Sequence, residues 1–229
     1  MKDSNEYGTH LKKLINRLQR SGGVAAEPEI QDVTTELILA CLSEYNPESK
    51  ARAALNKLRN YFVDFNELRV SRSTEVIEAL GKNFQEARPT AERILKVLRQ
   101  AFTKMNSMDL ESLHPMGKRE AKTFFESLEG ITPYVVSRVM MRGLDGHAFP
   151  VHAPMLKMLR AEEVVDAKAE TDEVQGFLER QITSARIHKV YALLRRHADH
   201  FKGVKSLNQK TKKKTSTKKK KKTTKRRSR

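Results

Sequence analysis

Apolar residues along the first 201 positions recur with the spacing of an α-helix, not with the alternation of a β-strand. Leu11, Leu14 and Leu18, for example, fall on one helical face, and the pair at 22–23 is glycine, which ends helices. The pattern predicts an all-α protein of about ten helices joined by short loops. The predicted segments cover residues 11–21, 30–42, 47–62, 76–80, 89–105, 118–128, 133–142, 155–159, 174–182 and 185–201.

Capping residues fix several of the expected helix ends. Asn46-Pro47 has the form of an N-cap followed by proline at the first helical position. Gly81 and Gly143 follow apolar segments and are expected to end them. The helical spacing also places Ile30 and Tyr61 on faces directed toward the core.

Positive charge is concentrated at the C-terminal end. Residues 202–229 contain 12 Lys and 3 Arg with no acidic residue, whereas residues 1–201 carry 30 basic and 28 acidic side chains. No apolar residue follows Leu207, so this segment cannot bury enough surface to offset its ordering entropy. We expect a disordered tail over residues 203–229 that binds DNA phosphates non-specifically or serves as a nuclear import signal. Its candidate DNA contacts are Lys212, Lys213, Lys214, Lys218, Lys219, Lys220, Arg226 and Arg227.

Composition excludes several classes of protein. Cys41 is the single cysteine, and its apolar neighbours indicate a buried core thiol. The chain therefore cannot form an internal disulfide or supply four thiolates to an iron–sulfur cluster. No apolar run approaches the roughly 18–20 residues of a membrane helix, and residues 1–13 lack the apolar core of a signal peptide. We expect a soluble intracellular protein, in the cytoplasm or nucleoid, or in the nucleus of a nucleated cell.

A short turn between two predicted helices is the most informative motif. Within residues 124–136, Gly130 is free to adopt a positive φ and Thr132 can cap the second helix. Backbone N–H groups then point outward at a helix N-terminus, where the helix dipole favours a phosphate oxygen. The motif predicts a sequence-independent DNA contact through Gly130, Ile131, Thr132 and Tyr134. A plain helical hairpin with no ligand is the alternative.

The order of motifs around this turn resembles the helix–hairpin–helix DNA glycosylase superfamily, the endonuclease III group in particular. In that family a Leu-Pro-Gly-Val-Gly hairpin precedes an apolar helix, a Gly-rich loop and a Val-Asp-Thr-His sequence. Here Leu128-Glu129-Gly130-Ile131-Thr132 precedes an apolar helix, the loop at 143–146 and Val151-His152. Residues 36–43 and 91–94 are similar to two earlier family helices, so the resemblance covers about residues 30–200.

The resemblance implies a two-lobed body over residues 1–202. One lobe would be a helical module of about residues 29–145, and the other would join residues 1–28 to residues 146–202. The cleft between them receives an extruded nucleotide in active members of the family. Tyr45 falls where the family places a polar residue facing the DNA lesion.

The chain departs from the family pattern at the catalytic positions. Lyase-type members use a Lys as the nucleophilic amine, and matching the hairpin places Tyr134 there. Matching the later motif on His152 places Pro150 at the position of the catalytic carboxylate, and proline can neither stabilise positive charge nor act as a base. Asp145 lies five residues earlier and is the one candidate substitute, although an Asp-Gly pair is also typical of a solvated turn.

No cofactor is expected. The family's four-Cys cluster loop is absent, and His197 and His200 at a polar helix end favour solvent exposure over metal binding. His147 and His152 flank the loop, where packing or loop hydrogen bonds are favoured over ligation.

Three functional hypotheses remain at this point. The first is a monomeric DNA-binding protein, related to base-excision repair glycosylases but non-catalytic or altered in activity, with intact or damaged double-stranded DNA as its partner. The second is an active DNA glycosylase or abasic-site lyase in base-excision repair whose carboxylate comes from another position. The third is a structural nucleoid or chromatin protein that condenses DNA.

Overall fold

The computed structural model describes residues 4–22 and 30–201. Within these ranges the chain forms α-helices joined by loops and contains no β-strand, which confirms the predicted all-α class. The tail predicted for residues 203–229, with its candidate DNA contacts, lies outside the described residues. The helices are α1 (Ser4–Gly22), α2 (Val33–Ser43), α3 (Glu48–Tyr61), α4 (Phe65–Val70), α5 (Ser73–Leu80), α6 (Ala87–Met105), α7 (Lys118–Glu126), α8 (Pro133–Arg142), α9 (Ala153–Ala161), α10 (Thr171–Gln181) and α11 (Ser184–Asp199), with a 3₁₀ turn η1 (Glu111–Leu113).

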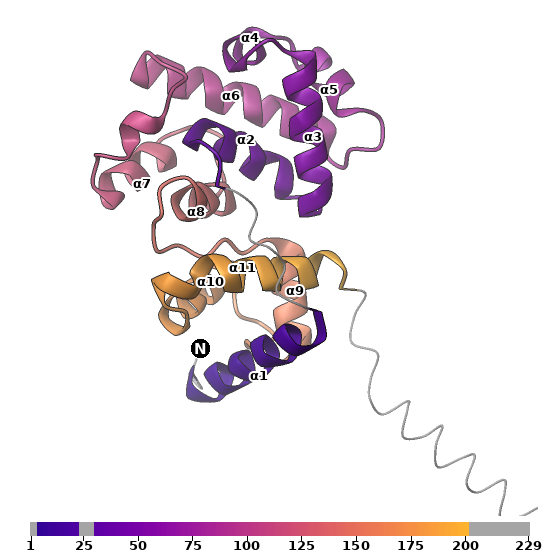
Figure 1. Cartoon of the computed structure of the whole chain (residues 1–229), viewed down its shortest axis with the longest axis vertical. Coiled ribbons are helices and arrows are strands. Elements are labelled where there is room, and N and C mark those ends of the chain that lie inside the picture. The colour runs from indigo at the N-terminus through magenta and orange to yellow at the C-terminus, as the bar shows by residue number, and fades with distance from the viewer. Residues whose placement is uncertain (1–3, 23–29, 202–229) are drawn as a thin grey trace, which may run out of the picture.

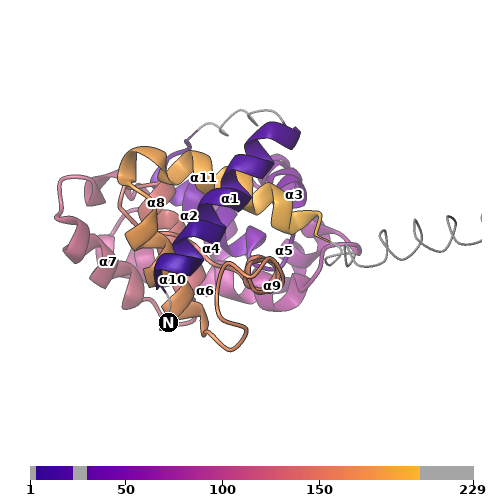
Figure 2. The same ribbon diagram turned by 90° about the horizontal axis from the view of Figure 1, so that it is seen from below.

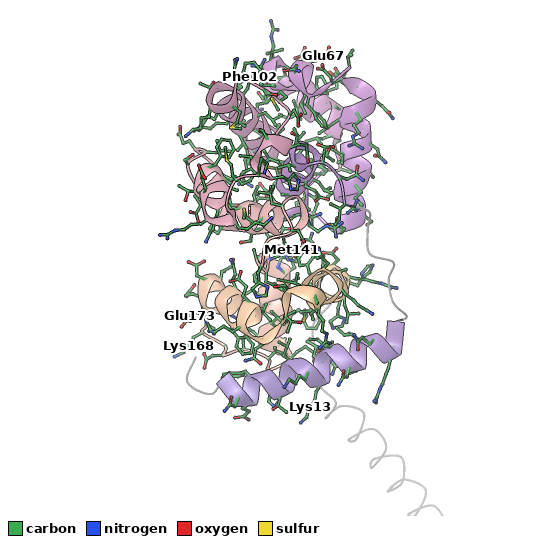
Figure 3. The ribbon with its side chains drawn as sticks, turned by 60° about the vertical axis from the view of Figure 1, so that its left-hand side comes forward. Lys13, Glu67, Phe102, Met141, Lys168 and Glu173 are labelled. Carbon is green, nitrogen blue, oxygen red and sulfur yellow. The ribbon has the colours of Figure 1, made fainter. Side chains whose placement is uncertain are left out.

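The helices are arranged in two layers (Figure 1). Helices α2 to α8 form one layer around a hydrophobic cluster that runs in sequence from Val33 to Leu144. Helix α1 joins α9, α10 and α11 in the other layer around a second cluster. Seen from below, α1 crosses α11, so the first helix packs against the last (Figure 2). Met141 of α8 belongs to the second cluster and lies where the two layers meet (Figure 3).

Helix α2 is the centre of the larger layer. All of its residues, from Val33 to Ser43, are buried, and it packs against α3, α6 and α8. Asp32 caps its N-terminus by accepting a hydrogen bond from the Thr35 backbone N–H at 2.8 Å. Cys41 lies on this helix, and burial raises the pKa of its thiol to about 12. The cysteine is therefore an inert core residue, as predicted.

Some details of the sequence expectation are wrong. Asn46 does not cap α3, because its side chain instead pairs with the backbone of Gln85, donating to the carbonyl at 3.0 Å and accepting from the N–H at 3.2 Å. Pro47 holds the N-cap position and makes no side-chain cap. Ile30 and Tyr61, expected to face the core, are 55% and 48% exposed.

Helix α4 was not predicted, because a helix of six residues contains too few positions to show a period. Its one buried side chain is Leu68. Asp64 caps it by accepting from the Glu67 N–H at 2.8 Å, so this local hydrogen bond and one apolar anchor define the helix.

The longest helices, α1 and α6, have 19 residues each and are apolar on one face only. Among the described residues, no helix is both long enough and apolar enough to cross a lipid bilayer.

Candidate nucleic-acid interface and buried polar cluster

The hairpin between α7 and α8 has the geometry that the sequence predicts. Gly130 adopts a φ of +86°, a value that favours glycine. The Ile131 N–H donates to the Leu128 carbonyl at 3.2 Å and closes the turn. The Thr132 hydroxyl accepts from the Val135 N–H at 3.3 Å, and Pro133 follows at the first helical position.

Three backbone N–H groups at this turn remain available to a ligand. Those of Gly130, Thr132 and Tyr134 donate to no acceptor within the described residues. They lie at the N-terminus of α8, where the helix dipole adds positive potential. This is the arrangement that binds one phosphate oxygen without reading a base.

Side chains of α6 support the turn from one side. Gln100 accepts from the Glu129 N–H at 2.8 Å, and Lys96 forms an ion pair with the Glu129 carboxylate. Lys104 donates to the Ser127 hydroxyl at 2.9 Å. Two lysines therefore lie beside the hairpin, and among the described residues Lys104 is the one without a carboxylate partner.

A groove beside the hairpin is acidic. This groove of about 450 Å³ between the hairpin and α10 is lined in part by Glu126, Asp172 and Glu179, with Lys122 as its basic residue. The same groove is lined by Ile131 and Thr132, so its carboxylates weaken the attraction of phosphate to that part of the turn. An approach from the side of α6, where Lys104 lies, is therefore favoured.

Tyr134 points away from that surface into a buried polar cluster where the two hydrophobic clusters meet. The side chain is 5% exposed. Its hydroxyl accepts from Arg195 at 2.7 Å and lies 3.0 Å from the Ser43 hydroxyl and 3.2 Å from that of Tyr191. We use the name polar cluster for Ser43, Glu48, Tyr134, Arg138, His152, Tyr191, Arg195 and Asp199.

Arg195 of α11 connects this cluster to the loop after α2. Its guanidinium donates to the backbone carbonyls of Ser43 at 2.7 Å and Asn46 at 2.6 Å. Its Nε lies 3.0 Å from the Asp199 carboxylate. Asp199 in turn accepts from the Glu48 N–H at 2.8 Å, and so caps α3 from another helix.

Arg138 of α8 forms the second buried ion pair. Both of its terminal nitrogens donate to the Glu48 carboxylate at 2.8 Å, and one also donates to the Tyr191 hydroxyl at 2.9 Å. Burial raises the pKa of Glu48, but the charge and hydrogen bonds of Arg138 outweigh it and lower the pKa to about 2. Burial of Tyr191 raises its pKa well above the ordinary value. Glu48 is therefore ionised and Tyr191 neutral at neutral pH.

His152, for which the sequence predicts packing or a loop hydrogen bond, packs inside the cluster and is 4% exposed. Its ring centroid lies 5.8 Å from that of Tyr134, and its Nε2 lies 3.7 Å from Asp199. Burial lowers its pKa to about 4, because burial and the charge of Arg195 together outweigh the raising effect of Asp199. The imidazole is therefore neutral at pH 7. Matching the family motif on Val151 instead of His152 would put His152, not Pro150, at the carboxylate position, in keeping with its contact with Tyr134. The residue that indicates this register in the sequence is Val151, which matches the Val of the family's Val-Asp-Thr-His motif.

The remaining candidates lie outside this cluster. Asp145, the substitute carboxylate, is 86% exposed and lies 3.2 Å from His188. It has a φ of +50°, which agrees with the turn role that an Asp-Gly pair favours. His147 bonds to the Glu179 carbonyl at 2.8 Å and to Ser184 at 3.0 Å.

The described residues contain no group of three or more His, Cys, Asp or Glu side chains able to hold a metal ion. His197 lies 3.6 Å from Glu162, and His200 bonds to the Arg196 carbonyl at 2.9 Å. Tyr45 is 40% exposed, and the Arg93 guanidinium lies 5.6 Å from its ring centroid.

The arrangement of layers, hairpin and buried cluster defines an all-α protein of the helix–hairpin–helix type. Comparison of the structure with solved proteins then specifies the fold. An endonuclease III in a trapped covalent complex with DNA superposes with a TM-score of 0.67 at 12% identity, over 87% of this chain and 89% of that chain. A thermostable thymine-DNA glycosylase gives 0.64 at 12% identity, over 89% and 91%.

The Helicobacter pylori 3-methyladenine DNA glycosylase bound to ethenoadenine gives a TM-score of 0.64 at 15% identity, over 86% of this chain and 97% of that chain. The chain has the endonuclease III-like helix–hairpin–helix DNA glycosylase fold, as the sequence resemblance implies.

The sequence matches no protein-family model. One curated relative, a provisionally named DNA glycosylase of Arabidopsis thaliana, is 25% identical over 171 residues, which is 75% of this chain. The match spans 58% of the length of that relative.

Proposed function

We propose that this chain binds double-stranded DNA through the hairpin at Gly130, assisted by the basic tail, and that it lacks the lyase chemistry of endonuclease III. The fold supports DNA binding, because two of the similar structures are endonuclease III–DNA complexes. The name of the Arabidopsis relative supports the same class of ligand. The expected partner is intact or damaged duplex DNA, and the expected state is a monomer inside the cell.

The polar cluster is the observation that carries the non-catalytic part of this proposal. The position that the resemblance assigns to the reactive amine holds Tyr134, and a phenol cannot form an imine with a sugar carbon. Its hydroxyl is already bonded to Arg195, Ser43 and Tyr191. An extruded nucleotide would have to break these contacts and separate the Arg195–Asp199 pair, which makes base extrusion into this region costly.

The hairpin supplies the DNA contact. Its three free N–H groups suit a phosphate oxygen, and Lys104 adds long-range attraction, whereas Glu129 balances the charge of Lys96. Because such contacts are to the backbone, they position the protein on DNA without selecting a sequence.

Fluorescence anisotropy with a labelled duplex tests the proposal. Gly130→Ala forces an L-residue into a φ of +86° and moves the hairpin N–H groups. We expect about tenfold weaker binding, equivalent to ~1.4 kcal/mol. The control is Gly81→Ala, which imposes similar strain at a φ of +85° in the α5–α6 loop. Equal affinity of both variants and the unaltered protein would show that the hairpin does not bind DNA.

A DNA glycosylase without lyase activity is the second candidate function, and Asp199 is the observation that favours it. This carboxylate lies in the polar cluster beside His152, and its pKa is lowered because the neighbouring His152 ring and the Arg195 charge together outweigh the effect of burial. It could stabilise positive charge on a sugar if the cluster opened. Excision of a damaged base by the full chain, abolished in Asp199→Asn while duplex binding persists, would establish this candidate instead.

A further inference from the structure

The outer face of α1 carries positive charges that the fold does not use. Lys12, Lys13 and Arg20 are exposed and have no hydrogen-bond or ion-pair partner among the described residues. Arg17 on the same face forms an ion pair with Glu162, and its Nη2 lies 2.6 Å from the carboxylate oxygen. Glu6 is the one acidic residue of this helix.

The cationic face continues onto α11, which packs against α1. Arg186 and Lys189 of α11 are also exposed and unpaired among the described residues. Lys12 and Arg186 line a common hollow of about 250 Å³. A second, shallower groove of about 540 Å³ is lined by Lys13, Asn16, Arg17, Arg20 and Ser21. We call these six cations the α1–α11 surface: Lys12, Lys13, Arg17, Arg20, Arg186 and Lys189.

Several cations elsewhere in the fold have structural partners. On α3, Lys57 donates to the Leu80 carbonyl at 3.3 Å, and Arg59 donates to the Thr35 hydroxyl at 2.9 Å. On α6, Arg99 donates to the Arg69 carbonyl at 2.9 Å. These side chains hold loops and neighbouring helices in place. Exposed cations without a partner among the described residues also occur elsewhere, for example Lys157 and Lys168. The α1–α11 surface differs in that five of its six cations line two grooves and, within the described part of the chain, only Arg17 has a carboxylate partner.

The chemistry of the surface fits a nucleic-acid backbone better than a protein. The exposed described residues of α1 are all polar or charged, while the cores of protein interfaces are depleted in Lys and enriched in aromatic residues. Lys13 and Arg20 are seven residues apart, about 10 Å along the helix. DNA presents about six phosphates over that length, so the spacing of the charges is compatible.

The α1–α11 surface lies away from the hairpin. In Figure 1, α1 lies beneath α10 and α11, whereas the hairpin joins α7 to α8 in the other layer. Lys13 points away from both layers (Figure 3). A duplex held at the hairpin would therefore leave this surface open.

We propose that the α1–α11 surface binds the phosphate backbone of a second DNA duplex, so that one chain bridges two duplexes. This rests on the proposed function, because the first duplex is held at the hairpin. The contact is non-specific and electrostatic, and it weakens steeply as salt rises.

A two-duplex capture assay with the full chain tests the proposal. One duplex is fixed to beads, and retention of a second, fluorescent duplex is measured against protein concentration. The variant Lys13→Glu with Arg20→Glu is compared with Lys157→Glu and Lys168→Glu, which changes the net charge equally at exposed positions on α9 and in the α9–α10 loop. All variants keep the tail. Fluorescence anisotropy with one labelled duplex alone measures the affinity of the first contact.

We expect the α1 variant to need about tenfold more protein for half-maximal bridging, with single-duplex affinity changed by less than about twofold. The control variant should bridge as the unaltered chain does. Equal bridging by both variants would overturn the inference and assign bridging to the tail or to another surface. Single-duplex binding without bridging by the unaltered chain would also overturn it, and would leave the proposed function intact. Failure to bind a single duplex would contradict the proposed function itself.

Discussion

Arg138 and Arg195 are almost fully buried, at 1% and 2% exposure, and each has a carboxylate partner. Removing a charge from water costs several kcal/mol, which a partner repays only with good geometry. The bidentate Arg138–Glu48 pair and the carbonyl contacts of Arg195 supply that geometry. These residues therefore fix the position of α8 relative to α3 and α11, and removing one partner should be far more damaging than removing both.

Glu48→Gln tests this at the residue level. The substitution removes the bidentate partner of Arg138 and leaves the buried Glu36, 3.9 Å away, as its remaining carboxylate neighbour. We expect a loss of about 3 kcal/mol in the free energy of unfolding at pH 7. The exposed pair between Arg88 and Glu92, at 3.8 Å, provides the control. Glu92→Gln should cost less than about 0.5 kcal/mol. Urea unfolding of the two variants gives the comparison, and equal losses would contradict it.

The polar cluster also sets the acid sensitivity of the protein. The pKa of Glu48 is lowered to about 2 and that of His152 to about 4. A lowered pKa means that the unfolded chain binds protons first, so stability falls as pH falls. We expect the loss to begin near pH 6.5 through His152 and to continue below about pH 4.5 through Glu48. Urea unfolding between pH 7 and pH 3 measures it, and the unfolding free energy of His152→Gln should be flatter between pH 6.5 and 4.5.

Single residues also show where sequence reasoning ends. Thr132 and Gly130 were identified because capping and a positive φ are local properties of the chain. The partners of Tyr134 could not be identified in this way, because Ser43, Tyr191 and Arg195 are 57 to 91 positions away in sequence. A single sequence carries no signal for such contacts.

Helix α3 depends on another helix for its N-terminal cap. Pro47 offers no side-chain hydrogen bond, and Asp199 of α11 accepts from the Glu48 N–H instead. Asp199→Ala removes this cap and the partner of Arg195 together, so we expect a loss of about 3 kcal/mol in unfolding free energy. Asp32→Ala removes the N-cap of α2, which is supplied by the residue directly before that helix, and should cost about 1 kcal/mol. Similar losses in thermal or urea unfolding would show that the cap from α11 adds nothing more than a local one.

At the level of elements, periodicity predicted helices such as α1, α3 and α6 because each has one buried face. Helix α6 is an example, with Ile94, Leu98 and Ala101 inward. Periodicity failed for α4, which is too short, and at the start of α3, where Asn46 is held by Gln85 of a distant loop. The start of α3 was predicted wrongly because a tertiary contact, not a local cap, determines the conformation of Asn46.

Across the whole molecule, the first helix packs with the last ones, and this arrangement came from the family resemblance rather than from the pattern of apolar residues. The boundaries proposed for the two lobes, 29–145 and 1–28 with 146–202, rest on the same resemblance. No property of α1 alone indicates its partner.

Salt dependence tests the role of the tail in the full chain. Residues 202–229 carry 15 positive charges, so log K for duplex binding should fall steeply with log salt, by about 0.9 per phosphate neutralised. Deleting residues 203–229 should flatten this slope and leave weaker binding by the nearly neutral remainder. An unchanged slope would remove the tail from the DNA contact.

The central claim is that the chain binds DNA without abasic-site lyase chemistry, and borohydride trapping on an abasic duplex tests it most directly. An amine that attacks the sugar leaves a covalent protein–DNA adduct after reduction. Anisotropy on the same sample shows that the duplex is bound, and an endonuclease III run in parallel shows that trapping works. With Tyr134 at the amine position, we predict a bound duplex and no adduct. A trapped adduct of the unaltered chain would contradict this account.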